Sequence, residues 1–423
     1  MKKIFWSMLL VAVTFSACTK PAEGEPDKPN PGGTEEPDKP KPPVIIEPGV
    51  AKITSLDRMA IAKDMGSGWN LGNTFDTRST NKKLWGRPTP TKALIDGVAD
   101  AGFKTLRIPV TWYPDLGARI GDAGTKVGEP KLGNKDIADQ LVVPMEFMMR
   151  IEEVAKWALA RDMYVIINTH HDEQWFMPKK GTPYDDVVDE ATKNIATVWS
   201  QIAKRLQRFG DHVIFETLNE PRVHEHPKEW EGGDAEGRAY INALNEAALK
   251  AIRKTGGNNR LRAVMLPQWG ANTAGIADLD LFDDPNVIVA VHAYDPYAFC
   301  LAPDDFPWKQ YGWGTASDKA GLDNMFRRIH DLYTSKGIPA VMGEWGASTR
   351  KVPDNLGGGT NEEDCIRHHT HYAEGCRKNG IVPVLWIMGY IDANNGKVKR
   401  PEIVKAVTEA GNLWLEDNEE TEK

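Results

Sequence analysis

The sequence has little cysteine, no excess of positive charge, and no long hydrophobic run beyond its N-terminus. Its 423 residues include four cysteines and carry a formal net charge of −8. This acidic balance argues against a nucleic-acid partner, because phosphate binding needs a clustered positive surface. Beyond the N-terminal segment, no apolar run is long enough to span a bilayer.

Residues 1–17 have the pattern of an export signal. Lys2 and Lys3 precede an apolar run over residues 4–15, and Ser16-Ala17-Cys18 follows as a small-residue site. The last residues before the site, with Cys18, resemble a bacterial lipoprotein signal, which implies that Cys18 is the first mature residue and carries a lipid. The alternative is a secreted protein that is cleaved nearby.

Residues 18–49 are rich in proline and charge, so they bury little apolar surface and are expected to form a disordered linker. As an extended spacer this linker reaches up to roughly 90 Å, at about 3.1 Å per residue. Glu23, Glu25 and Asp27 resemble the surface-export signals of Bacteroidetes lipoproteins. We therefore expect anchoring to the outer membrane with exposure at the cell surface; a periplasmic or secreted protein is the alternative. Residues 416–423 are expected to be a charged tail.

The remaining cysteines do not predict a disulfide framework. If Cys18 carries a lipid, the odd number of three is left: Cys300, Cys365 and Cys376. Cys365 and Cys376 fall in one expected helix, about 16 Å apart at 1.5 Å rise per residue. That separation is too great for a disulfide.

From residue 50 to 415, short apolar runs alternate with amphipathic segments. Such alternation builds βαβ units and a parallel sheet. Eight strands predict a single α/β domain with the (β/α)8 TIM-barrel fold; an open doubly wound sheet would usually carry a Gly-rich phosphate loop after its first strand, and none is present. The expected strands are 68–72, 105–110, 164–170, 213–220, 261–269, 287–294, 339–345 and 382–389, and the expected helices are 91–101, 144–160, 187–209, 240–255, 318–336, 362–378 and 401–410.

Polar or aromatic residues stand at the end of each expected strand, where packing alone does not call for them. Barrel active sites lie at these C-terminal strand ends. In chain order the residues are Asn70 with Asn73, Arg107, His170 with His171, Asn219 with Glu220, Gln268, His292 with Tyr294, Glu344, and Trp386.

Two of these residues, Glu220 and Glu344, suit cleavage of a glycosidic bond. The leaving oxygen needs a proton donor, and the developing oxocarbenium needs a carboxylate, so one carboxyl must be neutral while the other is charged. Arg107 and Tyr294 are expected to keep Glu344 ionised. Glu220 has no obvious cationic partner in the sequence, so it is the expected acid, oriented by His292.

Glu216 shares the strand parity of Glu220 but sits deeper in the barrel. We expect it to be the buried partner of Arg107 rather than a catalyst. Fourteen tryptophans are a high count, and those near strand ends are expected either to stack on sugar rings or to pack loops. They are Trp175, Trp269, Trp308, Trp313 and Trp345.

A metal site is the competing interpretation of the histidines. His170, His171 and Asp172, with His224 and His226, offer ligand types, but metal-dependent barrel hydrolases usually open with His-x-His on the first strand, where this chain has GWNLG. The sequence therefore predicts no metal and no other cofactor. A further set, His368, His369 and His371, is expected on the solvated face of a helix.

Taken together, the motifs resemble glycoside hydrolase family 5 across residues 50–415. GWNLGN and Trp85-Gly86-Arg87-Pro88 are most similar to the bacterial endo-β-1,4-glucanase and xyloglucanase branch, although that branch usually has Asn where Arg87 stands. The motifs that carry the family resemblance are GWNLGNTFD (68–76), LRIPVTW (106–112), NTHHD (168–172), FETLNEP (215–221), HAYDP (292–296), MGEWG (342–346) and Trp386.

The resemblance implies a retaining enzyme that cleaves internal β-1,4-glucosidic bonds of cellulose-like or hemicellulosic β-glucans. It makes Glu220 the acid/base and Glu344 the nucleophile, and it places Asn219 at the sugar 2-hydroxyl. Arg107, His170, His292 and Tyr294 would complete the subsite, with Trp386 as its stacking floor. Asn73 is expected to contact a more distant sugar, or else to cap the first turn, and His171 to support the subsite from behind.

Two alternatives remain open at this point: an endo-β-1,4-mannanase, and a non-catalytic surface barrel that binds glycans. An idle barrel would be expected to have lost one of the two glutamates, and both are present. The expected partners are a β-glucan substrate and, through the lipid, a membrane; the chain is expected to be a monomer.

Overall fold

The computed structural model describes residues 47–77, 89–112, 132–133 and 141–414. The expected signal peptide, the lipidation site Cys18, most of the linker, the motif at 85–88 and the tail at 416–423 lie outside these residues, so they stay predictions. Among the helices in the described ranges, none has both the length and the apolar character needed to cross a membrane.

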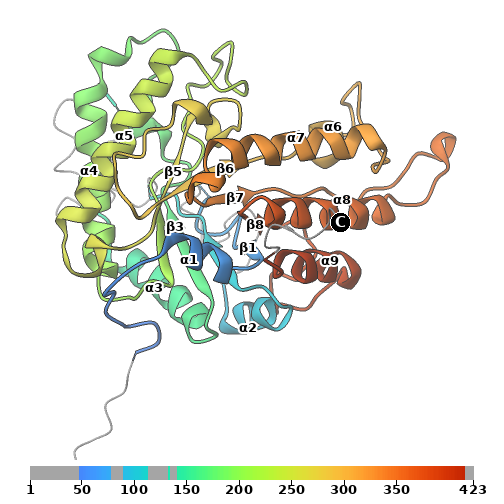
Figure 1. Ribbon diagram of the computed structural model, residues 1–423, viewed down its shortest axis with the longest axis horizontal. Coiled ribbons are helices and arrows are strands. Elements are labelled where there is room, and N and C mark those ends of the chain that lie inside the picture. Colours follow the sequence, from blue (N-terminus) through green and yellow to red (C-terminus); the bar gives the residue numbers. More distant parts are fainter. Residues whose placement is uncertain (1–46, 78–88, 113–131, 134–140, 415–423) are drawn as a thin grey trace, which may run out of the picture. The chain divides into compact units, whose positions relative to one another are not determined.

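Eight parallel strands form a closed barrel in the order β1 to β8, which confirms the expected TIM barrel (Figure 1). Every residue of these strands is buried, as is usual where helices cover a parallel sheet. The ring closes where Gly68 of the first strand pairs with Val384 of the last. The strands are β1 (Gly68–Asn70), β2 (Thr105–Ile108), β3 (Tyr164–Asn168), β4 (Val213–Glu216), β5 (Val264–Pro267), β6 (Val287–His292), β7 (Ala340–Glu344) and β8 (Ile381–Leu385).

The helices agree with the sequence pattern, apart from the short α1 and α6, which were not expected. Side chains at the N-caps fix several starts: Thr91 caps α2, Asp234 caps α5, and Thr315 forms a capping box with Asp318 on α7. The helices are α1 (Arg58–Asp64), α2 (Lys92–Asp100), α3 (Met145–Leu159), α4 (Val188–Leu206), α5 (Ala235–Lys254), α6 (Tyr297–Cys300), α7 (Ala316–Leu332), α8 (Glu362–Lys378) and α9 (Pro401–Gly411). Short 3-10 turns occur at 173–175, 184–186, 257–260, 269–271, 276–278, 334–336 and 354–356.

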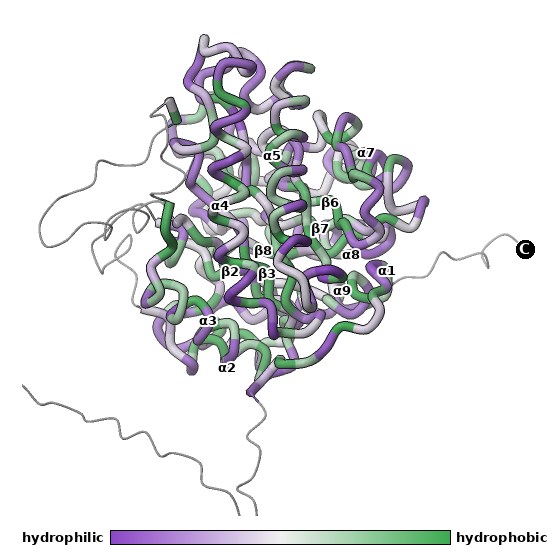
Figure 2. The backbone as a smooth tube through the Cα atoms, turned by 90° about the vertical axis from the view of Figure 1, so that its left-hand side faces the viewer, coloured by the Kyte–Doolittle hydropathy of each residue, from purple (hydrophilic) through white to green (hydrophobic). Residues whose placement is uncertain are grey.

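The core has two parts because alternate strand residues point to opposite sides of the sheet. One set, which includes Ile166, Ile214 and Met265, fills the barrel together with Ile61 of α1. The larger set packs the strands against the outer helices. Figure 2 shows hydrophobic residues in the central strands, while the outer helices alternate between hydrophobic and hydrophilic residues. The barrel is therefore filled, and its polar residues gather at the strand ends.

Helix α8 corrects one expectation and confirms another. His368 and His369 are fully buried, so the expected solvated face was wrong for both; His371 is half-buried and lies 2.8 Å from Asp323. A ring nitrogen of His368 and one of His369 each lie within hydrogen-bond distance of a main-chain oxygen. Burial lowers the pKa of His368 to about 3 and that of His369 to about 4. Both imidazoles are thus neutral. The three cysteines that the structure describes are free, as expected.

Candidate active site

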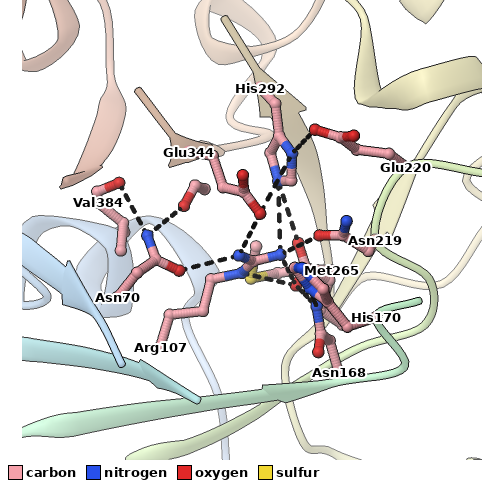
Figure 3. Close-up of polar contacts among 12 residues, drawn as sticks. Asn70, Arg107, Asn168, His170, Asn219, Glu220, Met265, His292, Glu344 and Val384 are labelled. Atoms are coloured by element: carbon pink, nitrogen blue, oxygen red, sulfur yellow. Dashed lines mark hydrogen bonds and ion pairs between the residues drawn. The ribbon is translucent and has the colours of Figure 1, made fainter. Parts of the chain in front are cut away.

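Arg107 on β2 is the centre of the polar cluster at the C-terminal end of the barrel (Figure 3). Its guanidinium is fully buried and donates to Glu216 at 2.8 Å, to Asn70 at 2.9 Å, to Glu344 at 2.9 Å and to Asn219 at 2.7 Å. Such a buried charge is tolerated because the four groups to which it donates are carboxylates or amide oxygens. Residues from three other parts of the chain, at the ends of β1, β4 and β7, thereby converge on one cation.

Two structural amides lie at the ends of β1 and β3: the sequence patterns named Asn70 as a strand-end residue, but they did not single out Asn168. Asn70 donates to the carbonyl of Gly343 at 2.8 Å while it accepts from Arg107. Asn168 donates to Glu216 at 2.9 Å and accepts from the amide of Val110 at 3.0 Å. Glu216 is the buried ion partner of Arg107, as expected. The signal for both amides was a polar residue in a strand that is otherwise apolar.

Glu344, the last residue of β7, has the two partners that were expected. Arg107 donates to its Oε1 at 2.9 Å, and the hydroxyl of Tyr294 donates to its Oε2 at 2.9 Å. Both carboxylate oxygens are therefore held in fixed positions. Only 7% of the side chain is exposed, so its open side is limited to the mouth of the barrel.

Glu220 differs from expectation, because it does have cationic partners. Nδ1 of His292 lies 3.0 Å from Oε1, and Nη1 of Arg222 lies 3.5 Å from Oε2. His292 lies at the end of β6, a strand end that the sequence had identified, and it makes the expected orienting contact with Glu220. Arg222 was missed because it follows Pro221 in a loop with no recognisable periodicity. Figure 3 shows the His292 ring directed at Glu220.

The pKa values of the three groups differ from the simple acid and base assignment. Burial lowers the pKa of His292, but the charge of Glu344 and hydrogen bonds with Glu216 and Glu220 raise it to about 9. Burial opposes ionisation of Glu220, yet the contact with His292 lowers its pKa overall. Burial raises the pKa of Glu344 despite His292 and Arg107. These shifts favour the proton of the His292–Glu220 pair on His292, 3.0 Å from the carboxylate.

A second group of residues lies at the same end of the barrel as His292 and Glu220. Trp386, just beyond β8, is half-buried and lies parallel to His170, with 6.1 Å between ring centroids and 6° between planes. His170 in turn packs edge-on against His171 at 4.3 Å. The backbone of Asn73 is in the left-handed region at φ 53°, and its main-chain N–H donates to the carboxylate of Asp76 at 2.9 Å. This geometry gives Asn73 the turn role; contact with a sugar stays a prediction.

The tryptophans near the strand ends divide clearly by exposure. Trp175, Trp269 and Trp345 are fully buried and Trp313 nearly so, which makes all four packing residues. Trp308 is 77% exposed. Trp230, which the sequence patterns did not identify, is 54% exposed in the loop between β4 and α5.

Among the residues that the structure describes, two groups of three side chains have ligand atoms within 4.8 Å of one another: Glu220 with His292 and Glu344, and Asp76 with His170 and His171. In the first group, the partners of the carboxylates are already Arg107, Arg222 and Tyr294, so an added cation would meet resident positive charge. In the second, Asp76 already accepts the amides of Asn73 and Thr74. His224 and His226 lie apart, beside Glu229 and Asp234.

The chain is similar to known enzymes over most of its length. The family model "Cellulase (glycosyl hydrolase family 5)" matches residues 66–392. Endoglucanase A of Clostridium longisporum is 37% identical over 349 residues, which are 80% of this chain and 60% of that relative. The chain thus spans about three fifths of that relative's length.

Solved structures extend the similarity to three dimensions. A broad specificity endoglucanase from Clostridium acetobutylicum superposes with a TM-score of 0.71 at 34% identity. The match covers 84% of this chain and 100% of the endoglucanase. ZgEngAGH5_4, solved in complex with a cellotriose, gives a TM-score of 0.71 at 36% identity, over 85% of this chain and 100% of the other. With the barrel and its paired glutamates, these matches show that the chain belongs to the cellulase family, glycosyl hydrolase family 5, and is a glycoside hydrolase.

Proposed function

We propose that this chain is an endo-acting β-1,4-glucanase that works with retention, through Glu344 as nucleophile and Glu220 as acid/base. One observation carries the assignment: an oxygen of Glu220, a nitrogen of His292 and an oxygen of Glu344 lie within 4.8 Å of one another. Retaining glycosidases hold their carboxyls about 5–5.5 Å apart, whereas inverting ones leave about 6.5–9.5 Å for a water molecule. The short separation supports direct attack by a carboxylate.

The first step forms a glycosyl-enzyme. An oxygen of Glu344 bonds to the anomeric carbon while the glycosidic C–O bond breaks, and Glu220 gives its proton to the departing oxygen. Arg107 and Tyr294 hold the attacking carboxylate in place. Asn219, which accepts from Arg107 at 2.7 Å, is the proposed contact of the sugar 2-hydroxyl.

The second step releases the sugar. Glu220, now ionised, takes a proton from water, and the resulting hydroxide bonds to the anomeric carbon as the bond to Glu344 breaks. His292 supports both steps, because a proton can move along its 3.0 Å contact with Glu220. Trp386 and His170 supply the aromatic surface on which the glycon rests.

The proposed substrates are cellulose-like and hemicellulosic β-glucans, including mixed-linkage glucan and xyloglucan. The similar proteins are an endoglucanase A and a broad specificity endoglucanase, which supports a β-glucan rather than a mannan backbone. The test is a product profile on carboxymethylcellulose, lichenan, xyloglucan and glucomannan. A rapid fall in viscosity with oligosaccharide products supports an endo-β-glucanase; activity confined to mannose linkages, or no turnover, contradicts the proposal.

We also propose that the enzyme is a monomer held at the outer surface of the outer membrane by a lipid on Cys18. The support is the signal pattern of residues 1–17 and the proline-rich spacer behind it. Replacing Cys18 with Ser should release the protein from the membrane fraction and abolish incorporation of labelled fatty acid. Retention of the variant in the membrane would contradict lipid anchoring. Light scattering on the soluble domain tests the monomer.

A further inference from the structure

Arg222 connects the carboxyl of Glu220 to the loop that follows β4. Its Nη1 donates to the main-chain oxygen of Glu220 at 3.0 Å and lies 3.5 Å from the Oε2 atom. Its Nε donates to Glu229 at 3.1 Å. Only 12% of the Arg222 side chain is exposed. The guanidinium is therefore fixed next to the one oxygen of Glu220 that His292 does not occupy.

The loop that holds Arg222 is itself well anchored. The second oxygen of Glu229 accepts the amide of Glu225 at 2.8 Å, and its main-chain oxygen accepts the indole N–H of Trp269 at 2.8 Å. Trp269 is fully buried, and a Cβ on Gly233 would come within 2.3 Å of its ring. Because buried groups hold this loop, its side chains are in position before a substrate binds.

Trp230 lies on the other side of the same guanidinium. The Cζ atom of Arg222 is 4.1 Å from the centroid of its ring, so a cation covers one face. Asn272 donates to the main-chain oxygen of Trp230 at 3.0 Å. Despite these contacts 54% of the residue is exposed. A fixed indole with an open face is suited to stack on the C–H face of a pyranose ring.

The position of Glu220 indicates which sugar would reach Trp230. Figure 3 shows Glu220 beyond His292, on the side away from Asn70 and Arg107. Trp386 follows β8, which lies across the barrel from β4 in the strand order, and it is stacked with His170, which follows β3 next to β4. Because the proton donor contacts the glycosidic oxygen, the departing sugar lies next to Glu220. Arg222 contacts Glu220, and Trp230 lies against Arg222.

We propose that Trp230 stacks on the leaving-group sugar and that Arg222 is a positioning residue, which holds the carboxyl of Glu220 in place for proton transfer through its contact with Oε2. This inference rests on the proposed β-glucanase function. As the C–O bond breaks, the carboxyl of Glu220 gives its proton to the glycosidic oxygen, and the carboxylate that forms faces the guanidinium through Oε2. No bond to Arg222 forms or breaks.

The test compares two substrates that share a cellobiosyl glycon. Cellotetraose has a sugar leaving group that needs a proton and can reach Trp230. β-Cellobiosyl fluoride has a leaving group too small for the platform and good enough to depart with little acid assistance. Arg222→Met, Arg222→Lys and Trp230→Ala are compared, with Arg238→Met as the matched control. Arg238 binds Asp278 at 2.6 Å and the carbonyls of Gly232 and Gly233, so it holds the same loop without contacting Glu220.

For cellotetraose, Arg222→Met should lower kcat/KM by about 100-fold, the lower end of what general acid catalysis contributes. For the fluoride, kcat/KM of this variant should stay within about threefold of the value for the unsubstituted enzyme, because the fluoride departs with little acid assistance. Arg222→Lys should recover part of the loss, because it restores the charge. Trp230→Ala should raise KM for cellotetraose about tenfold, as expected for loss of an aromatic contact, and leave the fluoride unchanged.

The opposite results are equally clear. Equal losses on both substrates in Arg222→Met would mean a general structural defect, and unchanged cellotetraose hydrolysis would mean no role in proton transfer. If Arg238→Met shows the same substrate dependence, loosening of the loop explains the effect and the inference is wrong. If the unsubstituted enzyme hydrolyses neither substrate, the proposed function itself fails.

Discussion

The Nδ1 atom of His292 lies 3.0 Å from Oε1 of Glu220, so the proposed acid/base and a buried imidazole share one hydrogen bond. The pKa of the imidazole is raised to about 9, while that of the carboxyl is lowered. Two groups that are this close titrate as a pair. The proton that the leaving oxygen needs is thus stored on the pair, and a bound sugar has only to draw it across to the carboxyl.

The pH dependence of activity should follow from this pair. The free enzyme loses the stored proton only as pH rises through about 9, the pKa of His292, so kcat/KM should fall on that basic limb. On the acid side it should fall where Glu344, with its raised pKa, becomes protonated. In His292→Asn a carboxyl alone holds the proton, so the basic limb should move to lower pH. A basic limb that does not move would contradict a proton shared with His292.

Replacement of Glu344 should remove the attacking group and leave the fold intact. Glu344→Ala is expected to lower kcat by on the order of 10⁴-fold or more, as for loss of other nucleophiles. Azide can enter the vacated space and attack from the same face, so the variant should convert an activated β-cellobioside to the α-glycosyl azide. The product is identified by NMR, and circular dichroism checks the fold. Activity near that of the unsubstituted enzyme, or a β-azide, would contradict the assignment.

Arg107 should be as important for stability as for catalysis. Arg107→Met leaves Glu216 buried without its ion partner, and breaking a buried pair in this way destabilises by about 3–5 kcal/mol. The matched control is Arg400→Met, because Arg400 pairs with Glu362 at the surface at 2.9 Å. Surface pairs contribute about 0–1 kcal/mol. The free energies of unfolding in urea give both values, and equal losses would show that the buried cluster is not a special source of stability.

Chelators should not affect the enzyme. The proposed mechanism transfers protons between carboxyls and the sugar, with no step that needs a metal, so activity after dialysis against EDTA should be unchanged. The control is the same preparation with added Zn²⁺ or Ca²⁺. Loss of activity that an added metal restores would contradict this prediction and would indicate a metal site at Asp76, His170 and His171, whose ligand atoms lie within 4.8 Å of one another.

The sequence predicts the barrel and most of the cluster for a physical reason. Apolar strands leave a clear pattern, and a polar residue such as Glu220 or Glu344 at a strand end stands out against it. The contact between Arg107 and Glu216 follows from strand parity in the same way.

What escaped prediction depends on tertiary contacts. Arg222 and Trp230 lie in a loop, where no periodicity indicates which side chains meet. His368 and His369 are polar residues on a helix, yet they are buried, with ring nitrogens next to the main-chain oxygen of Asp295 and to that of Cys365 in the same helix. The order of the pKa values of Glu220 and Glu344 depends on burial and on His292, neither of which the sequence specifies.

Trapping of the glycosyl-enzyme tests the central claim most directly. A 2-deoxy-2-fluoro-β-cellobioside with a good leaving group slows both steps, but the leaving group favours the first, so the covalent intermediate accumulates. Mass spectrometry of the intact and digested protein should find one fluorocellobiosyl unit on the peptide that contains Glu344. An adduct on Glu220, or none under conditions where the enzyme turns over β-glucan, would contradict a retaining mechanism with Glu344 as the nucleophile.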